Sequence, residues 1–164
     1  MGEPTKTEDT VLRNQLVELL RGGSAHADFD TCVDRLPPEC YGTRPNGAPH
    51  SAWQLLEHMR IALHDLLVFS TDSHYMAPKW PDNYWPRNEA PESAEEWQIS
   101  ANAIRADLAE FEELIQNPNT NLYAKIPWGE GQTFLREVLL AADHNSYHLG
   151  QLVMLRKQLD AWQG

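Results

Sequence analysis

The sequence lacks several features that would identify a class of protein directly. Only two of its 164 residues are cysteines, Cys32 and Cys40, and they do not form a CxxC motif. A domain of this length can bury a core that folds without disulfides, so two ordinary reduced thiols are expected, with a redox or ligand role as the alternative. No hydrophobic run approaches the roughly 20 residues that cross a membrane, so no spanning helix is predicted.

Positive charge is also scarce. The chain has 13 Lys and Arg against 24 Asp and Glu, a net charge of −11. A surface this acidic repels nucleic-acid phosphates and anionic membranes, so neither is an expected partner. The first ten residues, MGEPTKTEDT, have neither the hydrophobic region of a secretion signal nor the Arg-rich pattern of a transit peptide, which predicts a cytoplasmic protein.

Strand patterns are missing as well, together with internal repeats and low-complexity tracts. Hydrophobic residues recur instead at steps of three and four, which is the period of an α-helix. This period predicts four helices, over residues 8–36, 52–70, 94–116 and 133–161. Ser51 and Ser93, each followed three residues later by Gln or Glu, are typical of helix N-caps. The pattern favours an all-α four-helix bundle in a single domain spanning 1–164.

Two glycines interrupt the first predicted helix. Gly22 and Gly23 cost about 2 kcal/mol of helix propensity, so a kink or a break is expected there. Beyond them, His26 and Asp30 continue the hydrophobic stripe of this segment, one turn apart. This pair can be a core histidine bonded to a carboxylate, a group that contacts substrate or supports the site, or a fourth metal ligand. His26 and Asp30 are therefore candidate catalytic residues.

The connection between the second and third predicted helices, residues 72–91, is rich in proline and aromatic residues. It is too long for a hairpin turn, and it can cross the whole bundle and leave these two helices parallel, in an up-down-down-up order. Ordered loops of this length usually have a function or cover part of the fold. Trp80, Tyr84 and Trp85 are expected to anchor it, either as a strap over the core or as a lid over a site.

The last predicted helix is apolar on two sides. One stripe contains Leu135, Leu149 and Val153, and the other contains Leu152 and Leu155. A helix that is apolar on two sides is buried on two sides. This helix is therefore either central in the bundle or part of an interface with a second copy, and we predict a homodimer.

Two histidines lie four residues apart on this last helix. His144 and His148 share a face with Ala141 and Leu152, so both are expected to point inward. Buried imidazoles need polar partners, and this spacing is the one at which a helix offers two ligands to one metal ion. Asn145 occupies the place of the glutamate in an HExxH motif, so the internal general base of that motif is missing. These residues alone leave open a metal site, core histidines paired with polar groups, or an exposed pair.

One histidine of the second predicted helix lies close to the core. His58 lies at the edge of the core face of the second helix, and Asp65 follows two turns later on nearly the same side. Asp65 could orient His58 or act as an acid or base, which makes it a third candidate catalytic residue. His50, His64 and His74 are expected at the surface.

Two segments carry a resemblance to a known family. SAWQLLEHMRIALHDLLVFS and REVLLAADHNSYHLGQLVMLRKQL resemble the DinB-like superfamily, which includes YfiT-type proteins. The family pattern is a histidine early in the second helix, then HxxxH followed by GQ in the fourth, here His58, His144, His148, Gly150 and Gln151. The resemblance implies an up-down-down-up bundle, a divalent metal held by the three histidines, and frequent homodimers.

The resemblance also implies metal-dependent chemistry. Members include transferases of low-molecular-weight thiols and a mycothiol-dependent isomerase, and many others are described only as metal-dependent hydrolases. Three imidazoles suit Zn²⁺ or Ni²⁺ and leave a coordination position open. A metal-bound thiol needs no separate base, whereas hydrolysis usually needs one, so we favour a thiol S-transferase. The alternatives are a hydrolase using metal-bound water, a non-catalytic metal-binding scaffold associated with stress, or an interaction module without metal.

Overall fold

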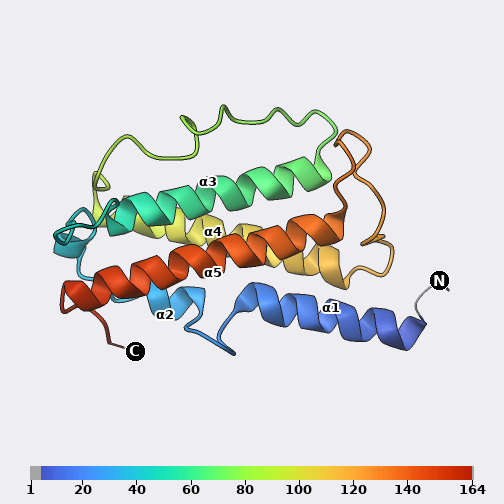
Figure 1. The fold of residues 1–164 in the computed structure, drawn as a ribbon, viewed down its shortest axis with the longest axis horizontal. Coiled ribbons are helices and arrows are strands. Elements are labelled where there is room, and N and C mark those ends of the chain that lie inside the picture. Colours follow the sequence, from blue (N-terminus) through green and yellow to red (C-terminus); the bar gives the residue numbers. More distant parts are fainter. Residues whose placement is uncertain (1–4, 164) are drawn as a thin grey trace.

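The computed structural model describes residues 5–163, which are built of helices and loops (Figure 1). In chain order the elements are α1 (Lys6–Arg21), α2 (Phe29–Val33), the 3-10 turn η1 (Pro38–Cys40), α3 (Ala52–Thr71), α4 (Ala94–Gln116) and α5 (Phe134–Gln158). Within the described residues the only β pairing is one isolated bridge between Lys125 and Thr133. The all-α prediction is confirmed.

The helices follow the predicted order. Figure 1 shows α3 and α4 running in one direction and α1 and α5 in the other. The connection of residues 72–93 passes along the length of α3 and brings the chain back to the end where α3 begins. The long crossover is therefore what makes α3 and α4 parallel and gives the up-down-down-up bundle.

The first helix is shorter than predicted. It ends at Arg21 because Gly22 and Gly23 adopt positive φ values of 70° and 84°, a region that favours glycine. The chain re-enters a helix at α2, where the Asp28 side chain caps the new N-terminus by accepting from the Thr31 backbone nitrogen at 2.8 Å. The expected break is confirmed, and the prediction of one element over 8–36 is wrong.

Both predicted serine caps form. The Ser51 hydroxyl accepts from the backbone nitrogen of Gln54, whose side chain accepts in turn from the Ser51 nitrogen, completing a capping box at α3. Ser93 caps α4 through the Glu96 nitrogen. The Glu96 side chain, however, accepts from Glu92 rather than from Ser93, so this second box is incomplete.

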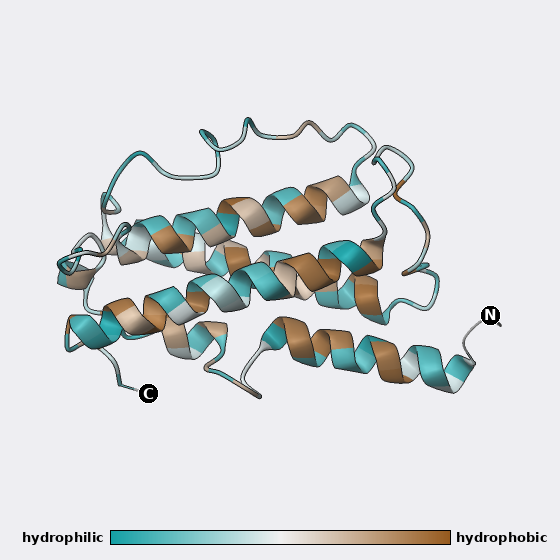
Figure 2. Ribbon diagram, in the orientation of Figure 1, coloured by the Kyte–Doolittle hydropathy of each residue, from teal (hydrophilic) through white to brown (hydrophobic). Residues whose placement is uncertain are grey.

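α5 is central in the bundle. It packs against α3 on one side and against α1 and α2 on the other, which accounts for its two apolar stripes. Leu149, Leu152 and Leu155 are buried, Val153 is half-buried, and Leu139 is 45% exposed. Figure 2 shows hydrophobic residues recurring between hydrophilic ones along each long helix. Because the bundle itself covers most of both stripes, they give no separate support for a dimer.

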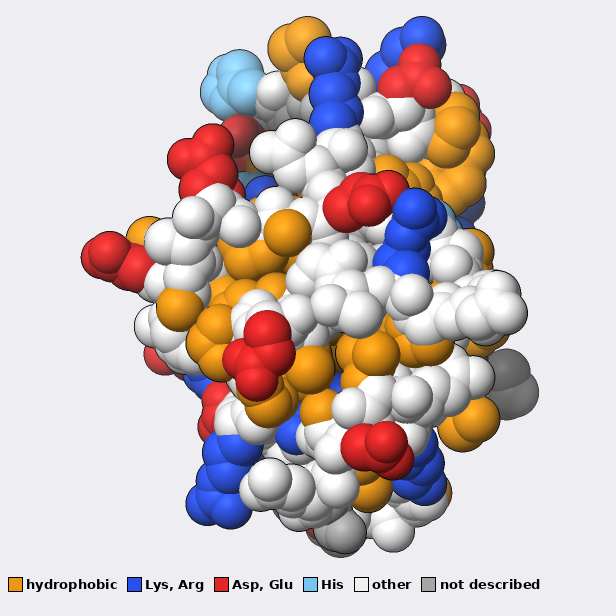
Figure 3. Space-filling view, turned by 90° about the vertical axis from the view of Figure 1, so that its left-hand side faces the viewer, with side chains coloured by type: hydrophobic (Ala, Val, Ile, Leu, Met, Phe, Trp, Pro, Cys, Tyr) orange, Lys and Arg blue, Asp and Glu red, His pale blue; other side chains and the backbone are white. Residues whose placement is uncertain are grey.

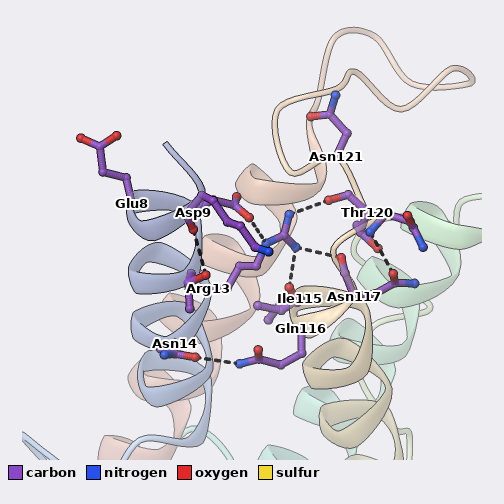
Figure 4. Close-up of polar contacts among 12 residues, drawn as sticks. Glu8, Asp9, Arg13, Asn14, Ile115, Gln116, Asn117, Thr120 and Asn121 are labelled. Carbon is purple, nitrogen blue, oxygen red and sulfur yellow. Dashed lines mark hydrogen bonds and ion pairs between the residues drawn. The ribbon is translucent and has the colours of Figure 1, made fainter. Parts of the chain in front are cut away.

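A buried arginine joins α1 to the end of α4. Arg13 donates through Nη1 to the carbonyl oxygens of Ile115 and Asn117, at 2.6 and 3.0 Å (Figure 4). Its Nη2 donates to the Thr120 carbonyl at 2.9 Å, and its Nε to the Asp9 carboxylate at 2.7 Å. A helix leaves its last carbonyls unpaired, and a cation there also suits the negative end of the helix dipole. Arg13 therefore fixes α1 against the C-terminus of α4.

Candidate metal centre

Three histidines from two helices meet inside the bundle. His58 of α3 and His144 and His148 of α5 each contribute one ring nitrogen to a group in which all three atoms lie within 4.8 Å of one another. Their ring centroids are 4.5 to 4.9 Å apart. His58 and His148 are buried and His144 is half-buried. We refer to these three residues as the histidine cluster.

Hydrogen bonds indicate where two of the imidazoles carry their protons. The His58 Nδ1 lies 2.7 Å from the backbone carbonyl oxygen of Tyr84. A carbonyl only accepts, so Nδ1 holds the proton and Nε2 keeps its lone pair. The His148 Nδ1 lies 2.8 Å from Oε1 of Gln151, which has the same consequence for its Nε2. Both side chains are therefore in the tautomer that binds a metal through Nε2.

The donor set fits a divalent ion. The Nε2 atoms of His58 and His144 are 3.1 Å apart. Two nitrogen ligands at zinc distance in tetrahedral geometry are separated by about 3.3 Å, close to this spacing. A hydrogen bond from His144 to His58 would explain this pair without metal. However, the His148 Nε2 makes no hydrogen bond to any of residues 5–163, so that explanation accounts for only two of the three imidazoles.

The electrostatic surroundings keep the histidine cluster neutral. Burial, with smaller contributions from the neighbouring rings of His148 and His58, lowers the pKa of His144 to about 4. Burial likewise lowers the pKa of His148 to about 4, with a further contribution from His58 and a partial offset from the bond to Gln151. Burial also lowers the pKa of His58. Neutral imidazole is the form that ligates metal, so no deprotonation is needed at neutral pH.

These pKa values predict how the metal-free protein responds to acid. The unfolded chain takes up protons on His144 and His148 below about pH 6.5, whereas the folded chain does so only near the lowered values of about 4. The unfolded state then binds more protons, so the free energy of unfolding should fall as the pH drops through this window. Urea midpoints of chelator-treated protein at several pH values measure this. His144→Gln, which cannot titrate there, should show a shallower decline, and an equal decline would contradict the assignment.

The crossover loop forms one wall of this site. The Trp85 indole lies between the rings of His50 and His58, with centroid distances of 3.9 and 3.8 Å and interplanar angles of 15° and 3°. His50 is half-buried in this stack, so the prediction of a simple surface histidine is wrong for it, whereas His64 and His74 are exposed as predicted. The loop therefore covers the histidine cluster as well as the bundle.

Two of the three predicted loop anchors hold it in place. Both oxygens of the Asp65 carboxylate accept hydrogen bonds, from the hydroxyls of Tyr75 at 2.7 Å and Tyr84 at 2.6 Å. Burial and the adjacent carboxylate raise the pKa of both tyrosines, which keeps them neutral donors. Trp85 is the second anchor, whereas Trp80 is 69% exposed and is not one. Asp65 therefore acts on His58 only indirectly: it holds Tyr84, and the Tyr84 carbonyl oxygen orients the His58 ring.

The other two candidate catalytic residues lie elsewhere. His26 is exposed in the bend between α1 and α2, with Nδ1 at 2.9 Å from the Ala27 carbonyl oxygen. Asp30 is exposed on α2 and pairs with Arg105 of α4 at 2.8 Å. Within residues 5–163, neither side chain bonds to the histidine cluster. The expected buried stripe is wrong because the two positive-φ glycines redirect the chain, and a catalytic role for either residue stays a prediction that this placement does not favour.

The two cysteines are free and lie outside the histidine cluster. Cys32 is fully buried, and burial raises the pKa of its thiol to about 11. Burial also raises the pKa of Cys40. Because the thiolate is the reactive and ligating form, neither residue is set up as a nucleophile or a metal ligand.

The family pattern includes Gln151, but the contacts that two groups make with the histidine cluster were not predicted from the sequence. Gln151 lies one helical turn after His148, and this spacing could have indicated the contact. The acceptor for His58 is a main-chain carbonyl of a distant loop, and no side-chain pattern indicates such a group.

One end of the bundle carries charges of both signs (Figure 3). Figure 3 views the end of the bundle where α5 finishes, and its Lys and Arg side chains are scattered among acidic and uncharged ones rather than gathered into a patch. Among the described residues, no helix has the length and hydrophobicity that a membrane crossing needs.

Comparison with known proteins agrees with the architecture and the histidine cluster. A family model described as the DinB superfamily matches residues 23–152, a segment that includes all three histidines of the cluster. No curated protein and no solved structure matches the chain. The matched segment covers well over half of the sequence, from just after α1 to within α5. The chain belongs to the DinB superfamily.

Proposed function

We propose that the protein holds one divalent metal ion on His58, His144 and His148 and transfers a low-molecular-weight thiol to an electrophile. The observation that carries this is the pair of fixed tautomers, in which Tyr84 and Gln151 occupy the Nδ1 protons and leave Nε2 free at the cluster. Imidazole ligands suit Zn²⁺ or Ni²⁺. A bound ion supplies a Lewis acid that lowers the pKa of a thiol, so that the sulfur reacts as thiolate.

The residues around the cluster favour thiol chemistry over hydrolysis. Attack by water usually needs a general base close to it. The group of potential ligands contains no carboxylate, and Asp65 is engaged by two tyrosines. Asn145, at the position of the HExxH glutamate, is an amide and cannot act as a base. Thiol transfer does not need this base, because the metal lowers the thiol pKa.

The reaction itself can be tested with a defined pair of substrates. Metal-loaded protein is incubated with N-acetylcysteine amide and 1-chloro-2,4-dinitrobenzene, where the sulfur forms a C–S bond and chloride and a proton leave. We expect product formation that requires both thiol and metal. Cleavage of p-nitrophenyl acetate without thiol would indicate the hydrolase instead. If neither reaction occurs across a panel of thiols and electrophiles while metal stays bound, the scaffold role is supported and the transferase is excluded.

The loop anchor gives a second test of the site. Asp65→Asn weakens the acceptor that holds Tyr84, and with it the carbonyl that orients His58. We expect metal affinity to fall about tenfold, the lower end of the range for groups that support metal ligands. Competition with a chromophoric chelator measures the affinity. Asp107→Asn is the matched control. Asp107 of α4 pairs with His64, an exposed histidine of α3, and its loss should leave the metal affinity unchanged. An Asp65→Asn protein that is less stable but binds metal normally would limit Asp65 to holding the loop.

We also propose a cytoplasmic homodimer. Family resemblance supports the dimer, and the two free cysteines are consistent with a reducing compartment. Size-exclusion chromatography with light scattering at micromolar concentration should give twice the 18.7 kDa chain mass, and a monomer there would remove the dimer proposal.

A further inference from the structure

A cavity adjoins the histidine cluster near the C-terminal end of α5. Its volume is about 470 Å³, within the range of roughly 300–1,000 Å³ typical of small-molecule sites. Residues 46–50 form one wall, and the face of α5 that carries Tyr147, Gly150, Gln151 and Met154 forms the other. Leu55 of α3 completes the apolar part of the lining.

The lining of this cavity contains no Asp, Glu, Lys or Arg side chain, and its one titratable base, His50, has a pKa lowered by burial. This is unusual in a chain with 24 acidic and 13 basic residues. The cation in contact with its wall is Arg44, whose Nη1 lies 3.4 Å from the Pro49 carbonyl oxygen. The Arg44 guanidinium is already paired with Glu89 at 2.7 Å. No Lys or Arg lines the cavity to pair with a ligand carboxylate, so the part of an anion that loses water on binding gains no ion pair in return, and an uncharged ligand is favoured.

Gly150 points to a ligand at this wall. It lies inside the 25-residue helix α5, where glycine costs about 1 kcal/mol relative to alanine. A Cβ added at Gly150 would meet no atom within 4 Å, and the residue has no positive φ. Neither packing nor backbone conformation therefore requires glycine. Its effect is to leave the helix surface bare where it lines the cavity.

Gln151 links the cavity to the histidine cluster. Its Oε1 accepts from His148, while its amide nitrogen makes no hydrogen bond to residues 5–163 and remains a donor at the cavity wall. Tyr147, on the same wall, has its ring 4.9 Å from that of His148. The three clustered histidines do not themselves line the cavity. A molecule in the cavity therefore lies beside the cluster, with Gln151 between the two.

We propose that this cavity binds the body of an uncharged, amphipathic small molecule and discriminates against carboxylates. A polar group of the ligand accepts from the Gln151 amide, and its apolar part packs on Leu55 and Met154 beside the bare surface of Gly150. That the bound molecule is a substrate of the histidine cluster rests on the proposed function. The binding preference itself can be measured without metal.

The test uses two probes that differ in one group, a neutral amide in one and a carboxylate in the other. N-acetylmethionine amide and N-acetylmethionine are titrated by ligand-observed NMR against the chelator-treated full chain. We expect the amide to bind at least tenfold more tightly than the acid. Gly150→Leu should weaken amide binding at least tenfold by filling the cavity, whereas Lys157→Leu, at an exposed position of α5 outside the lining, should not.

Several outcomes would overturn the inference. These are equal or tighter binding of the acid, no binding of the amide, or unchanged amide binding in folded Gly150→Leu. If that variant does not fold, Met154→Trp replaces it. Met154 is 57% exposed on the same wall, and a tryptophan there should likewise obstruct the cavity and weaken amide binding. Metal content is measured separately. Charge-selective binding in a protein that takes up no metal overturns only the proposed function, and stoichiometric metal without amide binding overturns only this inference.

Discussion

Protein purified without a nickel column is expected to carry about one divalent ion per chain, and His148→Ala is expected to lose it. Removing a group that merely supports a ligand costs about 10–100-fold in metal affinity, so removing one of three ligands should cost more than 100-fold. His148 is 6% exposed and its Nδ1 is held by Gln151, which keeps its Nε2 directed at the cluster. Elemental analysis gives the stoichiometry, and chelator competition gives the affinity.

The chain offers a matched control on α3. His64 is exposed, pairs with Asp107 and lies outside the histidine cluster. His64→Ala should therefore keep wild-type metal content. Unchanged metal in His148→Ala would exclude the proposed ligand set. A wild-type protein that takes up neither Zn²⁺ nor Ni²⁺ would mean that the cluster is a hydrogen-bonded core feature, with His144 donating to His58.

Arg156→Met is expected to reduce the free energy of unfolding by about 3–5 kcal/mol and the thermal midpoint by about 10 °C. The Arg156 side chain is 1% exposed and donates only to main-chain carbonyls. Its Nη1 reaches the oxygens of Thr31, Cys32 and Asp34, and its Nε and Nη2 both reach that of Ala161. Methionine fills a similar volume but leaves the two buried acceptors, the carbonyl oxygens of Cys32 and Ala161, without this donor, at about 1–3 kcal/mol for each. Urea and thermal unfolding measure the loss.

Two further substitutions separate this effect from a general loss of charge. Lys157→Met removes the neighbouring, exposed cation and should change stability by about 0.5 kcal/mol or less. Arg156→Lys keeps the charge but not the planar array of donors, so it should lie between wild type and Arg156→Met. Similar losses for Arg156→Met and Lys157→Met would show that the carbonyl contacts contribute little.

Local sequence signals predicted α3, α4 and α5 closely. Each is a long periodic segment with a serine or threonine N-cap, and such elements depend mainly on nearby residues. The first predicted helix depends on more than its nearby residues. The pattern indicated a kink or a break at Gly22 and Gly23 but not the direction of the chain beyond it. His26 and Asp30 were therefore placed on a buried stripe that the folded chain does not have.

Nearby residues likewise predicted only part of the candidate site. The spacing of His144 and His148 placed both on one face of a helix, because four residues make about one turn. Family resemblance added His58, 86 positions earlier, which spacing alone could not have paired with them. The carbonyl of Tyr84 could not have been predicted either, since it becomes available only when the crossover loop lies against α3.

By itself, the sequence determined the helical period, the caps and the shared face of the α5 histidines, because these depend on residues within a few positions of one another. Its composition also determined the acidic character of the protein. The tertiary structure alone decided that α3 lies against α5, that Trp85 packs between His50 and His58, and that a cavity without charged side chains adjoins the cluster. These features depend on contacts between distant segments. Such contacts are set by how whole helix faces and the crossover loop pack together, which no local pattern encodes.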